Sequence, residues 1–185
     1  MIEETLLEAE DKMDKAIDVA REDFGDIRSG RANAGMFEKI LVEYYGAMTP
    51  LQQLASITIP EARTVLVQPF DRSSMDSVEK ALRDSDLGVN PSNDGVVIRV
   101  VLPSLTEERR KEYVRLAKTK AEDARVSIRS VRRRAKEDLD KLAKDGEAGE
   151  DEVKRAQDEL DAMTKKSTDT VDSMLTAKEK ELLEV

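Results

Sequence analysis

Basic side chains recur along residues 106–144 at a spacing that could bind a polyanion. The segment holds 14 basic and eight acidic residues, a net charge of +6, whereas the other residues carry −15 and the whole chain −9. Six cations follow one another at intervals of three or four, with Glu122 as the only interruption: Arg115, Lys118, Arg125, Arg129, Arg132 and Lys136. One residue turns an α-helix by about 100°, so these six cations would form a basic ridge along one flank. Such a row suits a phosphate backbone better than a compact ligand.

The alternative is that the basic ridge is a solvated helix face, held by ion pairs between residues four apart. Few acidic residues lie in register with it between Arg125 and Lys136, which favours binding over ion pairing. The acidic net charge of the chain does not exclude a nucleic-acid partner, because binding responds to the local field.

The residue types in the chain give little support to a catalytic function. The chain has no histidine and no cysteine, so the commonest general base, the commonest metal ligand and the thiol nucleophile are missing. It contains neither a P-loop nor a GxGxxG motif. Carboxylate pairs such as Glu22-Asp23 lie on helix faces that we expect to be solvated. We therefore predict a protein that is not an enzyme, with no catalytic residue, cofactor or bound metal.

Three amphipathic helices are predicted to position the ridge. They cover residues 2–29, residues 106–144 and the segment after the glycine-punctuated turn at 144–149, each with apolar residues at intervals of three and four. None can bury its apolar stripe alone, so the three should pack as a bundle. The stripe beside the ridge contains Ala117, Ala121 and Ala124, small residues that allow a close approach of helices.

The N-terminus lacks the basic start and continuous apolar core of a signal peptide. No apolar run approaches the roughly 18 residues that span a bilayer. We expect a cytoplasmic protein with no membrane partner.

A small β-rich domain is predicted between the first two helices, because the apolar period changes there. Residues 40–45, 64–68 and 96–102 are strand-like, residues 46–50 read as a turn and residues 74–85 as a helix capped by Ser73 or Ser74. Asp94-Gly95 favours a hairpin, and one of Tyr44 and Tyr45 should point inward. The predicted fold is α+β, with an elongated three-helix bundle from residues 1–30 and 104–185 and an inserted β/α/β domain from residues 31–103.

The insertion requires two connecting segments, residues 29–33 and 102–106, which should lie next to each other. In the second of them, Pro103 ends a strand, and Ser104 with Glu107 could form a capping box. Two adjacent short connections allow either a hinge or a rigid corner, and both readings stay open.

Seven sequence blocks resemble the bacterial ribosome recycling factor family, in the family's order and over essentially the whole chain. They are IRSGRA (27–32), VEYYGAMTPL (42–51), QPFD (68–71), SDLGVNP (85–91), DG (94–95), PSLTEERRK (103–111) and IRSVRR (128–133). The resemblance implies an L-shaped, tRNA-like monomer that acts after termination. It would bind the large ribosomal subunit and its rRNA, and separate the subunits with elongation factor G, which hydrolyses the GTP.

The resemblance also implies roles for single residues. The rRNA contacts would be Arg110, Arg129, Arg132 and Arg133, with Arg28 and Arg31 as weaker candidates. The hinge would be Gly30, Arg31, Pro103, Ser104 and Leu105. Only Arg129 and Arg132 among the contacts also belong to the basic ridge.

Two positions depart from the family pattern. Ala34 replaces the usual proline, and Arg134 stands where an acidic residue is common, which should add positive charge beside the ridge. The competing hypothesis is a cytosolic helical adaptor or chaperone-like clamp, because bundle periodicity alone fits both. A GTPase is disfavoured by the missing P-loop and histidine.

Overall fold

The chain forms two units, each with its own core. The computed structural model describes residues 1–184, and it divides them into residues 1–28 with 107–184 and residues 29–106. The boundaries lie two to three residues from those expected from the sequence, so Ser29, Gly30 and residues 104–106 belong to the second unit.

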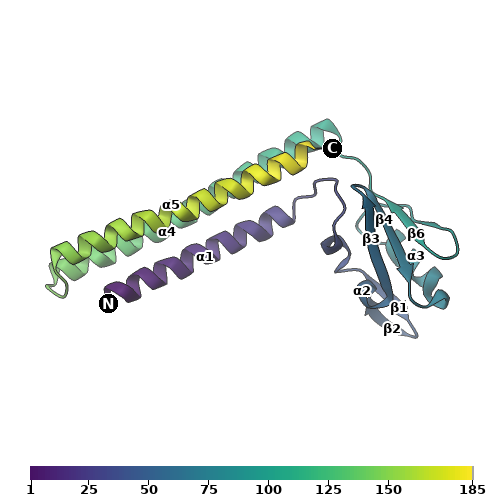
Figure 1. Cartoon of the computed structure of the whole chain (residues 1–185), viewed down its shortest axis with the longest axis horizontal. Helices are drawn as coiled ribbons and strands as arrows, with labels where there is room; N and C mark the ends of the chain where they lie inside the picture. The colour runs from purple at the N-terminus through teal and green to yellow at the C-terminus, as the bar shows by residue number, and fades with distance from the viewer. Residues whose placement is uncertain (185) are drawn as a thin grey trace. The chain divides into compact units, whose positions relative to one another are not determined.

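The first unit is a bundle of three helices: α1 (Ile2–Gly25), α4 (Glu107–Lys144) and α5 (Glu150–Leu183). Each helix contacts the other two, and Figure 1 shows α1 running alongside the α4–α5 pair. Met13, Ile128 and Leu160 are fully buried between them. The three alanines of the predicted stripe are buried as well, so the three-helix prediction and its close-packed seam are confirmed.

The first helix is shorter than predicted. It ends at Gly25, with Asp26 as its C-cap, rather than at Ser29. The apolar spacing continues to Ile27, which is buried, but its amide donates to the carbonyl of Phe24 in a tighter turn. The apolar spacing therefore predicted too long a helix, because the buried Ile27, which follows the helix, keeps the spacing of the helical residues.

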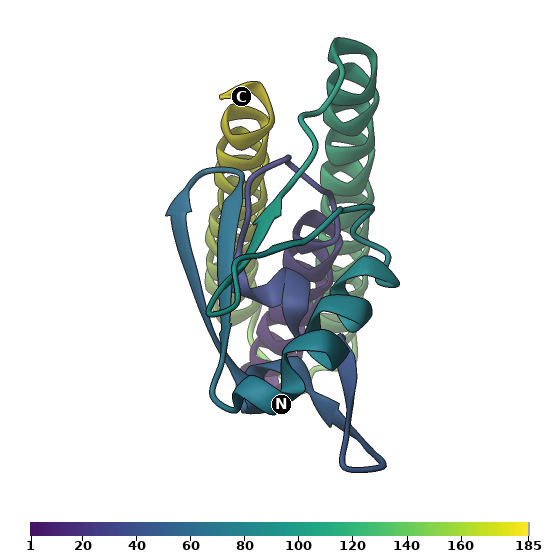
Figure 2. The same cartoon turned by 90° about the vertical axis from the view of Figure 1, so that its right-hand side faces the viewer.

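The second unit contains an antiparallel sheet in the order β3-β4-β6-β5. Its strands are β3 (Ala55–Glu61), β4 (Thr64–Pro69), β6 (Ile98–Val101) and β5 (Ser92–Asn93). The helix α3 (Met75–Arg83) lies against one face of this sheet in Figure 2. Val65, Val67, Ile98 and Val100 form one core with the buried face of α3. The predicted strand at 64–68 and the hairpin at Asp94-Gly95 are confirmed, and the strand predicted at 96–102 is present as the shorter β6.

A hairpin of β1 (Leu41–Tyr44) and β2 (Ala47–Pro50) corrects one prediction. Residues 47–50 are a strand rather than part of a turn, and only Tyr45 and Gly46 connect the two strands. Both have positive φ, 49° and 77°, which is the backbone of a two-residue type I′ turn. A helical turn, α2 (Leu51–Leu54), follows directly.

The edge strand β3 was not predicted from the sequence. It contains Pro60, which argues against a strand interior, and of its residues only Ala55 is buried. Its register shifts between Thr58 and Glu61. An exposed edge strand with a bulge lacks the alternation of burial that makes a strand visible in a sequence.

Asp71 organises the start of the helical segment that contains α3. Its carboxylate accepts from the amide of Ser73 at 3.0 Å and from the Ser73 hydroxyl at 2.7 Å, which lowers the pKa of Asp71. Neither serine caps α3 with its side chain: Ser73 lies within a short 3₁₀ turn (Arg72–Ser74) and Ser74 bonds the Asp71 carbonyl. The Tyr44 hydroxyl donates to Asp71 at 2.9 Å, whereas Tyr45 is 82% exposed. The inward and outward pointing of the two tyrosines is therefore confirmed.

The two connecting segments are adjacent, as expected. The Ala32 amide donates to the Ala62 carbonyl at 2.7 Å, and the Leu102 amide to the Arg63 carbonyl at 2.8 Å, so both segments attach to the β3–β4 turn. Gly30 has φ +77°, and a Cβ added there would lie 3.4 Å from Cγ of Leu105. Two predicted hinge residues therefore touch within the second unit.

Gly30→Ala is expected to lower the free energy of unfolding by about 1–2 kcal/mol, because an L-residue is strained at positive φ. Urea unfolding followed by circular dichroism measures this change. Gly25→Ala is the matched control: no atom lies within 4 Å of the added Cβ and φ is not positive. Equal stability of the two variants would contradict the assigned strain.

Candidate nucleic-acid interface

The basic ridge lies on α4 beside the buried seam. Ala117, Ala121, Ala124 and Ile128 face the interior. Of the cations one residue further along, Lys118 and Arg129 are exposed and Arg125 is half-buried. The helix itself thus places the cations of the ridge on one flank, as the 3.6-residue period predicts.

Arg125 does not behave as a free cation of the ridge. Its Nε and Nη2 lie 2.8 and 2.6 Å from Oδ1 of Asp172, on α5, and its Nη1 lies 3.1 Å from Oε2 of Glu122. The hydrogen bond to Asp172 is the main cause that raises the pKa of Arg125. With a side chain only 23% exposed, Arg125 joins α4 to α5.

Other ridge arginines also form ion pairs, although few acidic residues lie in register with them between Arg125 and Lys136. Arg129 Nη2 lies 2.6 Å from Oε1 of Glu122, and Arg132 Nε lies 2.7 Å from Oδ1 of Asp161. Arg129, ahead of Arg125, lowers the pKa of Glu122. Asp161 and Asp172 come from α5, so a search for partners along α4 alone could not find them.

The predicted contact residues fall into separate groups. Arg132 and Arg133 lie three and four residues after Arg129 on α4. Arg133 is exposed, and its side chain makes no hydrogen bond or ion pair within residues 1–184. Arg110 lies in the first turns of the same helix, half-buried. Arg28 and Arg31 are exposed, the first in the bundle unit and the second in the other. The structure thus gathers three of the six predicted contacts.

Arg110 lines a groove of about 580 Å³ between the start of α4 and the end of α5. Lys111, Arg115 and Lys118 contribute three further cations, and Glu107 and Glu179 two carboxylates. Lys111 forms an ion pair with Glu107 at 3.2 Å. Arg115 and Lys118 belong to the basic ridge, so the groove includes the part of the ridge that lies near the start of α4.

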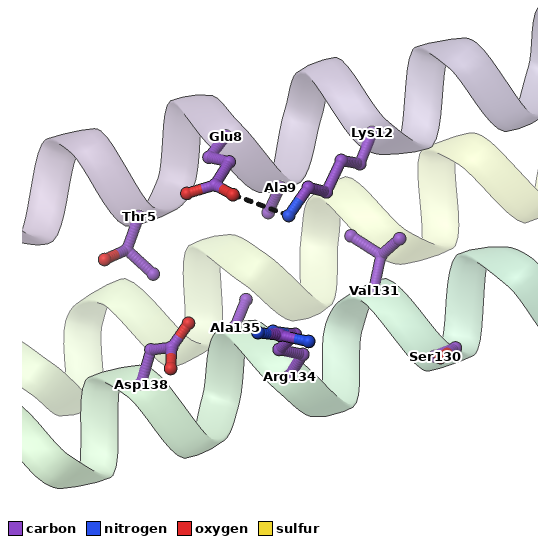
Figure 3. Close-up of a pocket in the computed structure, with 9 residues that line it drawn as sticks. All are labelled: Thr5, Glu8, Ala9, Lys12, Ser130, Val131, Arg134, Ala135 and Asp138. Carbon is purple, nitrogen blue, oxygen red and sulfur yellow. Dashed lines mark hydrogen bonds and ion pairs between the residues drawn. The ribbon is translucent and has the colours of Figure 1, made fainter.

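Arg134 lies on the α1 side of α4, where it lines a shallow cavity of about 110 Å³ (Figure 3). Glu8 and Lys12 of α1 face it there and form an ion pair with each other. Lys12 is the main cause that lowers the pKa of Glu8, and Arg134 contributes to it. The extra charge at this position therefore acts partly on α1 and not only beside the ridge.

Residues 1–184 contain no group of three or more acidic side chains placed to hold a metal ion. None of the helices in that part of the chain combines the length and apolarity that a bilayer crossing requires. What the structure offers to a ligand is the row of guanidinium groups on α4.

The fold and the site together define a class: an α+β protein with a helical-bundle unit in which one helix carries a concentration of arginine. A model of the ribosome recycling factor family matches residues 20–183. The chain belongs to the ribosome recycling factor family. The ribosome-recycling factors of Kineococcus radiotolerans and Streptomyces avermitilis are 70% and 64% identical to it over 185 residues, the whole of each chain.

Two solved structures resemble the chain along its full length. A solution structure of a ribosome recycling factor matches with a TM-score of 0.77 and 42% identity, covering 100% of this chain and 98% of the other. The second match has a TM-score of 0.66 and 43% identity, covering 99% of both chains. It belongs to models of the Thermus thermophilus ribosome recycling factor and the Escherichia coli elongation factor G bound to the Escherichia coli post-termination complex.

Proposed function

We propose that this chain recycles ribosomes after termination. Together with elongation factor G and GTP, it separates the post-termination ribosome into subunits and releases mRNA and deacylated tRNA. The observation that carries the proposal is full-length identity of 70% to a ribosome-recycling factor. The similarity to a factor bound with elongation factor G to a post-termination complex supports the choice of partners.

Within this function, α4 binds rRNA of the large subunit. Arg129, Arg132 and Arg133 form the central contact with the RNA. Arg110 makes a further contact near the start of α4. Arg28 and Arg31 contribute less to RNA binding. The support is local: these cations lie on a helix segment of net charge +6 in a chain of −9, and phosphate contacts depend on the local field.

The protein itself is not a catalyst in this proposal. It needs no cofactor, because elongation factor G hydrolyses the GTP. It acts as a monomer in the cytoplasm, where post-termination ribosomes are found. Gly30, Arg31, Pro103, Ser104 and Leu105 form the hinge between its two units.

Splitting of post-termination ribosomes tests the function. Complexes with mRNA and deacylated tRNA are mixed with the protein, elongation factor G of the same organism and GTP, and light scattering is recorded. We expect scattering to fall only when all three are present, because the energy comes from the GTPase. The protein with GTP alone should show no turnover above the blank.

Retained scattering with all three components would contradict the proposal, provided that a known recycling factor splits the same complexes. Binding to ribosomes stripped of most surface proteins then separates the remaining possibilities. Binding without splitting would indicate a ribosome-binding relative with another task, and absence of binding would favour a helical adaptor.

A further inference from the structure

The ridge arginines differ in how many of their nitrogens the protein already occupies. A guanidinium has five N–H groups on three nitrogens. All three nitrogens of Arg125 contact carboxylates. The side chain of Arg132 is 40% exposed, and only its Nε–H donates a hydrogen bond, to Oδ1 of Asp161. Both of its Nη nitrogens therefore remain available to a ligand. Arg125 thus makes contacts within the protein through its whole guanidinium, whereas the guanidinium of Arg132 is held at Nε and has its two Nη nitrogens available.

Asp161 provides a fixed point for this contact. It follows the buried Leu160 on α5, a helix packed along α4. Arg132 is the sole ion-pair partner of Asp161 within residues 1–184. A long arginine side chain loses rotamer freedom when it binds, and an anchor on Nε removes part of that loss before a ligand arrives.

We propose that Asp161 is a positioning residue, which accepts the Nε–H of Arg132 and thereby presents the two Nη nitrogens to an RNA phosphate. Phosphate takes two parallel N–H groups from a guanidinium, so the orientation of the plane decides whether both bonds form. The inference rests on the proposed function. An opposite effect competes with it: the negative charge of Asp161 repels phosphate, so its removal would tighten binding if orientation did not matter.

Asp161→Ala and Asp161→Asn separate orientation from charge. Both remove the charge, but the Asn amide oxygen still accepts from Nε. We expect Asp161→Ala to weaken binding to large ribosomal subunits by roughly two- to tenfold, the effect of ordering one long side chain on binding. Asp161→Asn should bind within about twofold of the unchanged protein, and Asp161→Ala should have no effect in an Arg132→Ala background.

The matched control is Asp158→Ala, which removes the same charge from an exposed position about one turn earlier on α5. It should not weaken binding. Circular dichroism should be unchanged in all variants, because an exposed ion pair contributes little to folding.

Each other outcome overturns the inference. Tighter binding by both Asp161 variants would make Asp161 a competitor of the phosphate. No change, equal weakening by Ala and Asn, or a loss that persists without Arg132 would show that Asp161 does not orient this arginine. Failure of the unchanged protein to bind subunits would instead refute the proposed function, so the two failures are distinguishable.

Discussion

Replacing Arg129, Arg132 and Arg133 together by alanine is expected to weaken binding to large ribosomal subunits by roughly 100-fold. A charge-assisted hydrogen bond contributes about 1 kcal/mol or more, and each 1.4 kcal/mol changes affinity by about tenfold. Titration of labelled protein with subunits measures the effect at fixed salt. The fold should persist, because the three side chains lie at the surface and alanine favours the helix.

Salt dependence identifies the lost contacts as phosphate contacts. The logarithm of affinity falls by roughly 0.7–0.9 per phosphate contact for each decade of salt, so the triple variant should lose about 2–3 from the magnitude of that slope. The control removes the same charge from α5, with Lys154, Arg155 and Lys166 replaced by alanine. Similar losses in the two triple variants would show that binding follows net charge and not the α4 surface.

Ile128→Ala is expected to cost about 2–5 kcal/mol of unfolding free energy, because deleting a buried aliphatic side chain leaves a cavity. Ile128 is fully buried, where α4 packs on the other two helices. Urea unfolding monitored by helical circular dichroism should show an earlier transition. At low temperature the folded fraction should still bind subunits, since Ile128 contributes to packing and not to the exposed surface.

Val126→Ala provides the comparison on the same helix, because Val126 is 52% exposed. It should change the stability by less than about 0.5 kcal/mol. If both variants lost the same stability, the face of α4 assigned to the buried seam would be wrong.

The three bundle helices and the β5–β6 hairpin of the second unit follow from local patterns. Apolar spacing predicted all three bundle helices and the alanine seam, and Asp94-Gly95 predicted its hairpin. Local patterns did not predict the strands in which burial does not alternate. β3 lies at the edge of its sheet, and β2 falls within residues 46–50, which were predicted as a turn, although only Tyr45 and Gly46 connect the two strands. Tertiary pairing, not propensity, makes these segments strands.

The basic ridge shows the same division within the functional surface. The sequence alone determines that the cations share one flank of a helix, since that follows from 3.6 residues per turn. Only the tertiary structure decides which of them are available, because Asp161 and Asp172 reach Arg132 and Arg125 from another helix. Helix geometry repeats over a few residues, whereas an ion pair forms wherever packing brings two side chains within about 4 Å, however far apart they lie in the chain.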